Sequence, residues 1–353
     1  MKKKLLLLSF LAAAAFTSNA QDAPKGDPPL VISGSVDTYY KYDFSGIRNA
    51  AGSSNIPTSF ASDQNSVSIG MIDLGLKKKI GKAAFVGEMS FGPRGQAQSI
   101  PNGTSGDSFH IQNLYVSYDL SDKFTVTGGY MATFVGYEVI SPVGNFNYST
   151  SYLFTNGPFQ NAGLKGTYTF SDKASLMAGI FNDSWNAYSS AKDVSTFGAQ
   201  LFLSPAKGWT AYINLVSGKT SGTEVDFTTA YQITDAFKLG LNAATFTAND
   251  KIAKGGFSGV ALYPQIAVSK DVTLGLRGEY FKTKDGSYTL LGPAPGSSVT
   301  AFTLTANVKA GPLTFIPEIR LDQNKSITDG FVNNDLLAKK SASQFVLAAV
   351  YAF

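Results

Sequence analysis

The stretch Gln344-Phe-Val-Leu-Ala-Ala-Val-Tyr-Ala-Phe353 alternates between the two faces of a strand, and this alternation decides the fold. Successive side chains of a β-strand point to opposite faces, so one face carries Phe345, Leu347, Ala349, Tyr351 and Phe353. That face is continuously apolar and suited to contact with lipid. Any half-buried strand alternates in a similar way, so the interpretation depends on the rest of the chain.

The N-terminal segment predicts export. Lys2 to Lys4 precede an apolar run from Leu5 to Phe16, and Ser18-Asn-Ala20 has the small-x-small pattern of a cleavage site. The run is shorter than the roughly 20 residues that a helix needs to span a membrane, and no Cys follows that could be lipidated. We therefore expect residues 1–20 to be a cleaved signal peptide and residues 21–353 to form a single domain.

Composition argues against several functions. The chain has no Cys, which removes disulfides, thiolate metal sites and a Cys nucleophile. Without Lys2 to Lys4, 26 of the 29 basic residues remain against 25 acidic ones, and a net charge near +1 provides no basic surface for nucleic acid. No phosphate loop, metal-ligand spacing or dinucleotide fingerprint occurs. We expect no cofactor, no metal and no nucleic-acid partner.

The single histidine, His110, leaves one catalytic alternative to weigh. A Ser-His relay at the lipid boundary would resemble an outer-membrane phospholipase, but the chain lacks the His-x-Ser-x-Gly stretch of such an enzyme. A histidine close to a loop is also common at a membrane interface. We therefore do not expect an enzyme.

Short turns and longer tracts alternate along the chain. The short turns are residues 80–82, 121–123, 171–173, 204–208, 234–236, 269–271 and 310–312. The longer tracts, rich in Gly, Ser, Asn and Pro, are residues 44–65, 92–107, 136–160, 182–193, 217–223, 247–256, 283–297 and 323–341. Outer-membrane barrels sort their connections in this way, with short periplasmic turns and long extracellular loops. The pattern predicts an all-β fold, a transmembrane antiparallel up-and-down barrel of about 16 strands.

The predicted strands have one apolar and one polar face. In residues 222–233, Val225, Phe227, Thr229, Tyr231 and Ile233 oppose Glu224, Asp226 and Thr228. In residues 123–134 we expect Phe124, Val126, Tyr130 and Phe134 to point outward. With the apolar faces in lipid, the interior is predicted to be wet and charged. Pro264 and Pro317 fall inside strands, and because each removes a ladder hydrogen bond, we expect a bulge or register defect at both.

Several of these features together resemble the OmpL-like β-barrel porin family of bacterial outer membranes. They are the signal-like N-terminus, the Ser-Asp-Lys turns, the aromatic C-terminus and the tract Asn147-Tyr-Ser-Thr-Ser-Tyr-Leu-Phe154 followed by Gly157-Pro158. The resemblance covers residues 21–353 and implies passive diffusion of small hydrophilic solutes through a water-filled channel in the bacterial cell outer membrane. Tyr351 and Phe353 resemble the assembly signal at the end of bacterial outer-membrane β-barrels, which implies contacts with lipid and with the barrel-assembly machinery. A homo-oligomer is left open.

The tract 136–160 is the predicted constriction, because in general porins the third long loop folds into the lumen. Its candidate residues are Tyr137, Glu138, Asn145, Phe146, Asn147, Tyr148, Tyr152 and Phe154. The alternative is an outward loop that caps the barrel. Seven charged residues are predicted to face the lumen: Glu88, Lys165, Lys238, Arg277, Glu279, Glu318 and Arg320. One interpretation is that these charges set the ion preference of the channel. The other is that they only form a solvated lumen wall, held by cross-strand pairs such as Arg277 with Glu318 or Arg320 with Glu279.

A porin is the function we expect from the sequence. The segment from Gln21 to Pro29 is too short for a plug domain, and a barrel of about 16 strands is wide enough for an aqueous channel. The alternative is a structural, adhesion or docking barrel of the cell surface without open-channel activity, which the long tracts 44–65 and 323–341 keep open.

Overall fold

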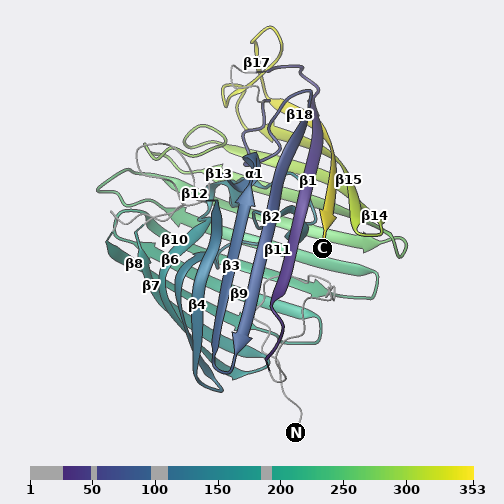
Figure 1. The fold of residues 1–353 in the computed structure, drawn as a ribbon. Coiled ribbons are helices and arrows are strands. Elements are labelled where there is room, and N and C mark those ends of the chain that lie inside the picture. The colour runs from purple at the N-terminus through teal and green to yellow at the C-terminus, as the bar shows by residue number, and fades with distance from the viewer. Residues whose placement is uncertain (1–26, 49–53, 97–109, 184–192) are drawn as a thin grey trace.

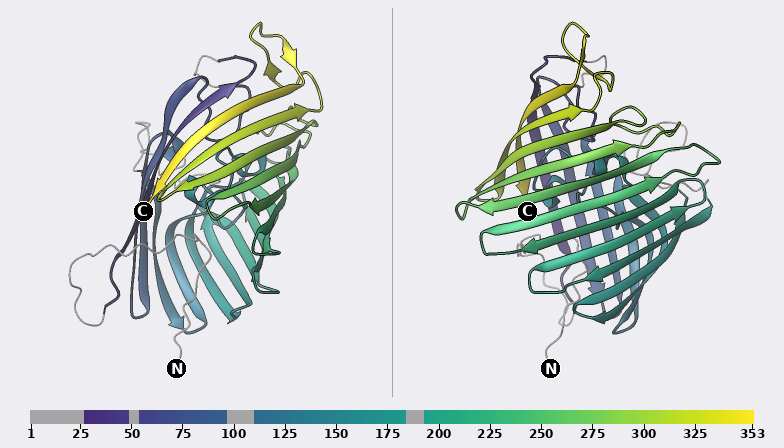
Figure 2. Two further views of the ribbon diagram at one scale, coloured as in Figure 1. Left: turned by 90° about the vertical axis from the view of Figure 1, so that its right-hand side faces the viewer. Right: turned by 180° about the vertical axis from the view of Figure 1, so that it is seen from behind.

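A computed structural model describes residues 27–48, 54–96, 110–183 and 193–353. The predicted signal peptide and parts of the tracts 44–65, 92–107 and 182–193 lie outside the described residues. Within the described chain, sixteen strands form one closed antiparallel barrel (Figures 1 and 2). The predicted fold class is therefore confirmed.

The barrel strands pair with their neighbours in sequence, and the pairing of β1 with β18 closes the barrel. The strands are β1 (Val31–Asp43), β2 (Ser66–Ile80), β3 (Ala83–Phe91), β4 (Ile111–Ser121), β5 (Phe124–Ala132), β6 (Gln160–Ser171), β7 (Ala174–Asn182), β8 (Val194–Leu203), β9 (Trp209–Gly218), β10 (Gly222–Gln232), β11 (Phe237–Thr247), β12 (Gly256–Ala267), β13 (Val272–Thr283), β14 (Ser298–Ala310), β15 (Leu313–Asn324) and β18 (Ser341–Ala352).

The connections hold the few remaining elements. They are α1 (Pro93–Gln96), the 3-10 turn η1 (Pro142–Gly144), α2 (Tyr152–Asn156) and a small hairpin of β16 (Phe331–Val332) and β17 (Ala338–Lys339), which lies at the top of Figure 1. No helix in the described part of the chain is long and apolar enough to cross a membrane.

Short and long connections alternate as the sequence predicted, with one exception. The tract 217–223 shrinks to residues 219–221, because β9 and β10 extend to Gly218 and Gly222. Gly222 makes the tight turn possible with a φ of +113°, a conformation that residues with a Cβ rarely adopt.

The in-out alternation is confirmed on most strands. On β10, Val225 and Phe227 are exposed on the outer surface, while Glu224, Asp226 and Thr228 are buried inside. The aromatic residues next to the short turns also lie on the outer surface, as expected for an interfacial girdle: Tyr118, Tyr168, Phe170, Trp209 and Tyr351. The prediction was wrong for Phe134, which is 8% exposed and borders the interior cavity. Tyr130 is 4% exposed, but it pairs with Leu114, which is exposed on the outer surface, so the register keeps Tyr130 on the outer face.

Pro264 and Pro317 do not shift the register of their strands. Each pairs across one neighbouring strand, Pro264 with Leu239 and Pro317 with Leu347. On the other side the ladder skips the proline and one adjacent residue, then continues in the same register. The expected bulges are therefore wrong, because the missing N–H costs local pairs on one side only.

The barrel interior is divided into two parts, which corrects the prediction of a uniformly wet and charged interior. Next to β11–β15 and β18, buried apolar side chains from strands and loops form a packed core that includes Tyr152, Phe246, Phe257, Phe281 and Phe331. Beside this core lies open space, which strands β2–β6 and β8–β12 border. The packed part exists because the long connections supply apolar side chains to cover the inner wall.

Phe353 closes the barrel at Gly34 on β1. The two residues exchange backbone hydrogen bonds, both N to O at 3.0 Å. A Cβ on Gly34 would stand 2.5 Å from the Phe353 ring and 2.6 Å from the Asp73 carbonyl oxygen. The missing Cβ of Gly34 therefore leaves the space that the Phe353 ring occupies at the closing strand pair.

The two faces of β10 make a testable pair. We expect Phe227→Arg to reduce the free energy of unfolding by about 2–4 kcal/mol, because the charge would enter lipid near the middle of the strand. The neighbouring Thr228→Arg should cost less than about 1 kcal/mol, since Thr228 borders open space inside the barrel. Folding titrations into lipid vesicles measure both, and equal losses would contradict the assignment of faces.

Closure at Gly34 is tested with a matched glycine. Gly34→Ala should cost about 1–3 kcal/mol through the clash with the Phe353 ring and the Asp73 carbonyl. Gly87→Ala on β3 is the control, because no atom lies within 4 Å of its added Cβ. Urea titration of both variants gives the difference, and an unchanged midpoint for Gly34→Ala would show that the contact is unimportant.

Candidate functional site

The connection between β5 and β6, residues 133–159, lies inside the barrel, and we call it the inner loop. Tyr148 and Tyr152 at its centre are 1% and 0% exposed. Its backbone is held by side chains from β13, β14 and β15, namely Glu279, Asn307 and Glu318. A buried backbone needs such partners, because an unpaired N–H or C=O away from water is costly.

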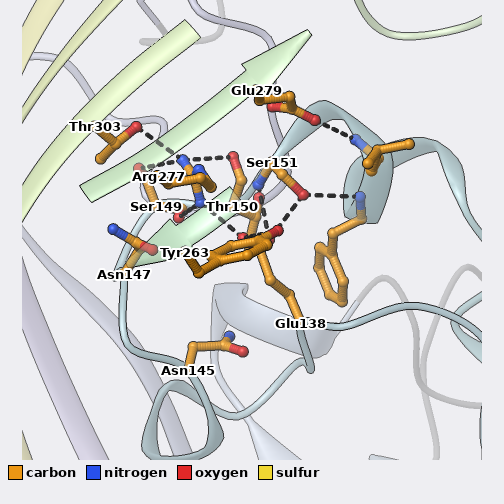
Figure 3. Close-up of polar contacts among 12 residues, drawn as sticks. Glu138, Asn145, Asn147, Ser149, Thr150, Ser151, Tyr263, Arg277, Glu279 and Thr303 are labelled. Carbon is orange, nitrogen blue, oxygen red and sulfur yellow. Dashed lines mark hydrogen bonds and ion pairs between the residues drawn. The ribbon is translucent and has the colours of Figure 1, made fainter. Parts of the chain in front are cut away.

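Glu138 and Arg277 form the central ion pair of this attachment (Figure 3). Arg277 Nη1 donates to Glu138 Oε1 at 2.8 Å, and both side chains are almost fully buried. The other carboxylate oxygen accepts from the Ser151 backbone N–H at 2.7 Å and from its hydroxyl at 3.0 Å. Arg277 also donates to the Ser149 carbonyl at 2.6 Å and to Thr303 on β14 at 3.1 Å.

Glu279 binds the first turn of α2. Its two carboxylate oxygens accept from the backbone N–H groups of Tyr152, at 3.0 Å, and Leu153, at 2.9 Å. The first N–H groups of a helix have no partner within the helix, so an inward carboxylate satisfies them. Ser151 caps the same turn by accepting from the Phe154 N–H at 3.0 Å.

Glu318 and Arg320 on β15 hold residues 148–150 of the inner loop, which come just before α2. Glu318 accepts from the backbone N–H groups of Tyr148, at 3.0 Å, and Ser149, at 3.2 Å. Arg320 donates to the Thr150 carbonyl at 2.7 Å and is fixed by two hydrogen bonds to Asp322. The expected cross-strand pairs of Arg277 with Glu318 and of Arg320 with Glu279 are wrong, because β14 separates β13 from β15 and each charge instead serves the inner loop.

Two loop tyrosines donate to carboxylates that the sequence analysis did not select. The Tyr148 hydroxyl donates to Asp37, and the Tyr152 hydroxyl donates to Asp322 at 2.8 Å. Burial raises the pKa of both tyrosines, so they remain protonated donors. Asp37 sits at a register shift between β1 and β2, and its other oxygen accepts from the Met71 N–H. The alternation of β1 places Asp37 on the inner face, and this was the feature of the sequence that could have identified it as a partner of the loop.

Glycines on the inner wall make room for the aromatic side chains of the loop. A Cβ on Gly275 would stand 2.2 Å from the Phe146 ring, and one on Gly240 would stand 2.2 Å from the Tyr137 hydroxyl. Such close approach is possible only where the strand has no side chain. Inward-facing glycines on β11 and β13 were a second signal for the docking of a loop.

A cavity of about 680 Å³ remains between the inner loop and the opposite wall. Six of the eight candidate loop residues border it: Tyr137, Glu138, Asn145, Phe146, Asn147 and Phe154. Across from the loop, the wall offers amide and hydroxyl groups, among them Gln112, Asn113, Gln160, Gln200, Thr210 and Tyr212. The cavity is therefore lined mainly by neutral hydrogen-bonding groups and aromatic rings, and Glu88, Glu138 and Lys238 are the charged residues that border it.

The seven predicted lumen charges fall into three groups. Glu88 and Lys238 border the cavity. The second group consists of the four charges that hold the inner loop and are buried beneath it: Arg277, Glu279, Glu318 and Arg320. The third is Lys165, which is half-buried on β6. Glu88 accepts a hydrogen bond from Asn113 Nδ2. Few of the predicted charges therefore meet open space.

A closed barrel with an apolar exterior, a loop attached inside and a polar cavity defines an outer-membrane protein of the porin class. The family model described as "Putative beta-barrel porin-2, OmpL-like" matches residues 29–353, so the chain belongs to this family. The resemblance inferred from the sequence is confirmed, as is the location in the outer membrane of Gram-negative bacteria. No curated protein matches the sequence.

Solved structures with this fold are outer-membrane channels and porins. The outer membrane channel DcaP of Acinetobacter baumannii is 14% identical, with a TM-score of 0.64 over 95% of this chain and 100% of that chain. The anion-selective porin from Comamonas acidovorans is also 14% identical, with a TM-score of 0.64 over 92% and 99%. The trimer form of OmpT from Vibrio cholerae is 13% identical, with a TM-score of 0.55 over 92% and 99%. At these identities the likeness shows the fold.

The ion pair of Glu138 with Arg277 can be tested by removing one charge. Glu138→Gln should cost about 3 kcal/mol, near the low end for breaking a buried pair, because Glu318 still lies close enough to offset part of the Arg277 charge. The double variant Glu138→Gln with Arg277→Gln should lose less than the two single variants combined. Chemical unfolding in micelles measures all three, and additive losses would show that the pair is not coupled.

Proposed function

We propose that the protein is a porin through which small hydrophilic solutes diffuse passively. The supporting observation is the cavity of about 680 Å³ that the inner loop leaves open beside the polar wall. Neutral amides and hydroxyls exchange hydrogen bonds with water and with polar solutes at little net cost. A lining of this kind lets a solute pass without trapping it.

In this proposal the inner loop is the constriction. Five carboxylates of the wall accept hydrogen bonds from it, and Arg277 and Arg320 of the wall donate to it. These contacts fix its position, so the cross-section beside it is set by packed side chains. Glu88 and Lys238 carry opposite charges at the cavity surface and give weak ion selectivity. Residues 1–20 act as the export signal, and Tyr351 with Phe353 acts in assembly.

A docking barrel is the second candidate, favoured by the β16–β17 hairpin. Leu336 and Leu337 at its tip are 71% and 61% exposed, and the hairpin projects beyond the barrel in both views of Figure 2. Exposed apolar tips of this kind serve as contacts for partners. A porin should conduct less when a side chain narrows the cavity, whereas docking through the hairpin should not depend on the width of the cavity.

Conduction is tested by narrowing the cavity from its wall. Ala230, on the inner face of β10, borders the cavity, and we expect Ala230→Trp to roughly halve the single-channel conductance. Ala178→Trp is the matched control, because Ala178 points outward from β7 into lipid. Planar-bilayer recordings of folded protein decide the matter, and reversal potentials in a salt gradient measure the selectivity.

The proposal fails if the folded wild-type protein carries no current. It fails equally if both Trp variants conduct like the wild type, because current would then follow a route outside this cavity.

A further inference from the structure

The outer face of β13, β14 and β15 changes from apolar to cationic as it approaches the long connections. The register of the three strands and the alternation along each define three successive rows of outward residues. The first row is Gly278, Phe302 and Leu321, the second is Tyr280, Thr300 and Gln323, and the third, which we call the lysine row, is Lys282, Ser298 and Lys325. Tyrosine is typical of the level at which hydrocarbon meets headgroups, so the lysine row lies at headgroup level.

Lys282 and Lys325 are close enough to contact one ligand. Lys282 pairs with Ser298 across β13 and β14, and the Lys325 backbone N–H donates to the Ser298 carbonyl at 2.8 Å. Because neighbouring strands are about 4.8 Å apart, the two lysine backbones are about 10 Å apart. Each lysine has a flexible four-carbon stem, so both ammonium groups can reach an anion held between them.

The positive charge of the lysine row is not neutralised by the protein. Lys282 and Lys325 are exposed, and among the described residues neither forms an ion pair. Lys284 adds a third positive charge just beyond Lys282, since its ammonium group donates to neutral oxygens of residues 245–247. This part of the outer wall therefore presents uncompensated cations beside lipid-facing residues.

At the other edge of the same three strands, the outward row is apolar. The residues next to the short turns there are Val272, Val308 and Phe315. Lys309 follows Val308, but the alternation of β14 places it on the inner face. Long connections are extracellular in outer-membrane barrels, so the lysine row meets the outer leaflet, which consists of phosphorylated glycolipid. The difference between the two edges matches the difference between the two leaflets.

We propose that the lysine row binds a phosphate group of the glycolipid of the outer leaflet. The acyl chains cover the apolar residues below the row, and Lys282 and Lys325 donate charge-assisted hydrogen bonds to the phosphate oxygens. The position selects a lipid over a free anion, because the apolar rows below hold the chains of the same molecule. The site is on the outer wall and does not depend on conduction.

Native mass spectrometry of the folded protein in neutral detergent tests the site with three lipids. Diphosphoryl lipid A carries the phosphates, dephosphorylated lipid A has the same chains and sugars without them, and phosphatidylglycerol has one phosphodiester and no sugar. We expect diphosphoryl lipid A to bind at least about tenfold more tightly than either of the others. Equal binding of dephosphorylated lipid A or of phosphatidylglycerol would overturn the proposal.

Variants assign the binding to the lysine row. Lys282→Gln and Lys325→Gln should each weaken the binding of diphosphoryl lipid A about fivefold, and together about thirtyfold. Lys282→Arg should keep the wild-type affinity, because it keeps the charge. Lys78→Gln is the matched control, since Lys78 pairs with the exposed Phe85 on the outer face of β2 beside a short turn, and it should change nothing.

A double variant that binds like the wild type would reject the lysine row as the site, as would an equal loss in Lys78→Gln. The measurement needs no current, so a silent barrel that binds diphosphoryl lipid A would refute the porin proposal alone. A conducting barrel that does not bind it would refute this inference alone.

Discussion

The inner loop stays inside the barrel because carboxylates on the wall accept its backbone N–H groups. Glu279 and Glu318 each bind two consecutive N–H groups, which removes the main cost of burying a chain segment away from water. The carboxylates in turn are tolerated because Arg277 and Arg320 lie among them and donate to loop carbonyls. Removal of any one member leaves a buried polar group without its partner.

This attachment also organises the other connections. The inner loop bonds to the segment around Ser59 through Thr150 and Thr155, and to the 284–297 connection through Asn156. Apolar side chains from these connections then cover the inner wall of β11–β15 and form the packed core. The open part of the lumen is the space that this core does not reach, so the same contacts that fill one side of the barrel define the cavity on the other.

The sequence predicted the barrel well because alternation and turn spacing are local properties. On β10 the polar residues Glu224, Asp226 and Thr228 alternate with Val225 and Phe227, and the structure places the polar ones inside. Tyr280 and Phe281 show where the signal ends, since these consecutive aromatics are 45% and 0% exposed and face lipid and core respectively. Phe134 was misplaced for the same reason, because an interior with its own apolar core accepts the residues that otherwise mark the lipid face.

The candidate site was only partly predictable, since periodicity identifies the face of a charge but not its partner. Arg277, Glu279, Glu318 and Arg320 do point inward, yet their partners lie more than a hundred residues away in the inner loop. Strand neighbours could not reveal this, because the relevant neighbour is a loop that crosses the lumen.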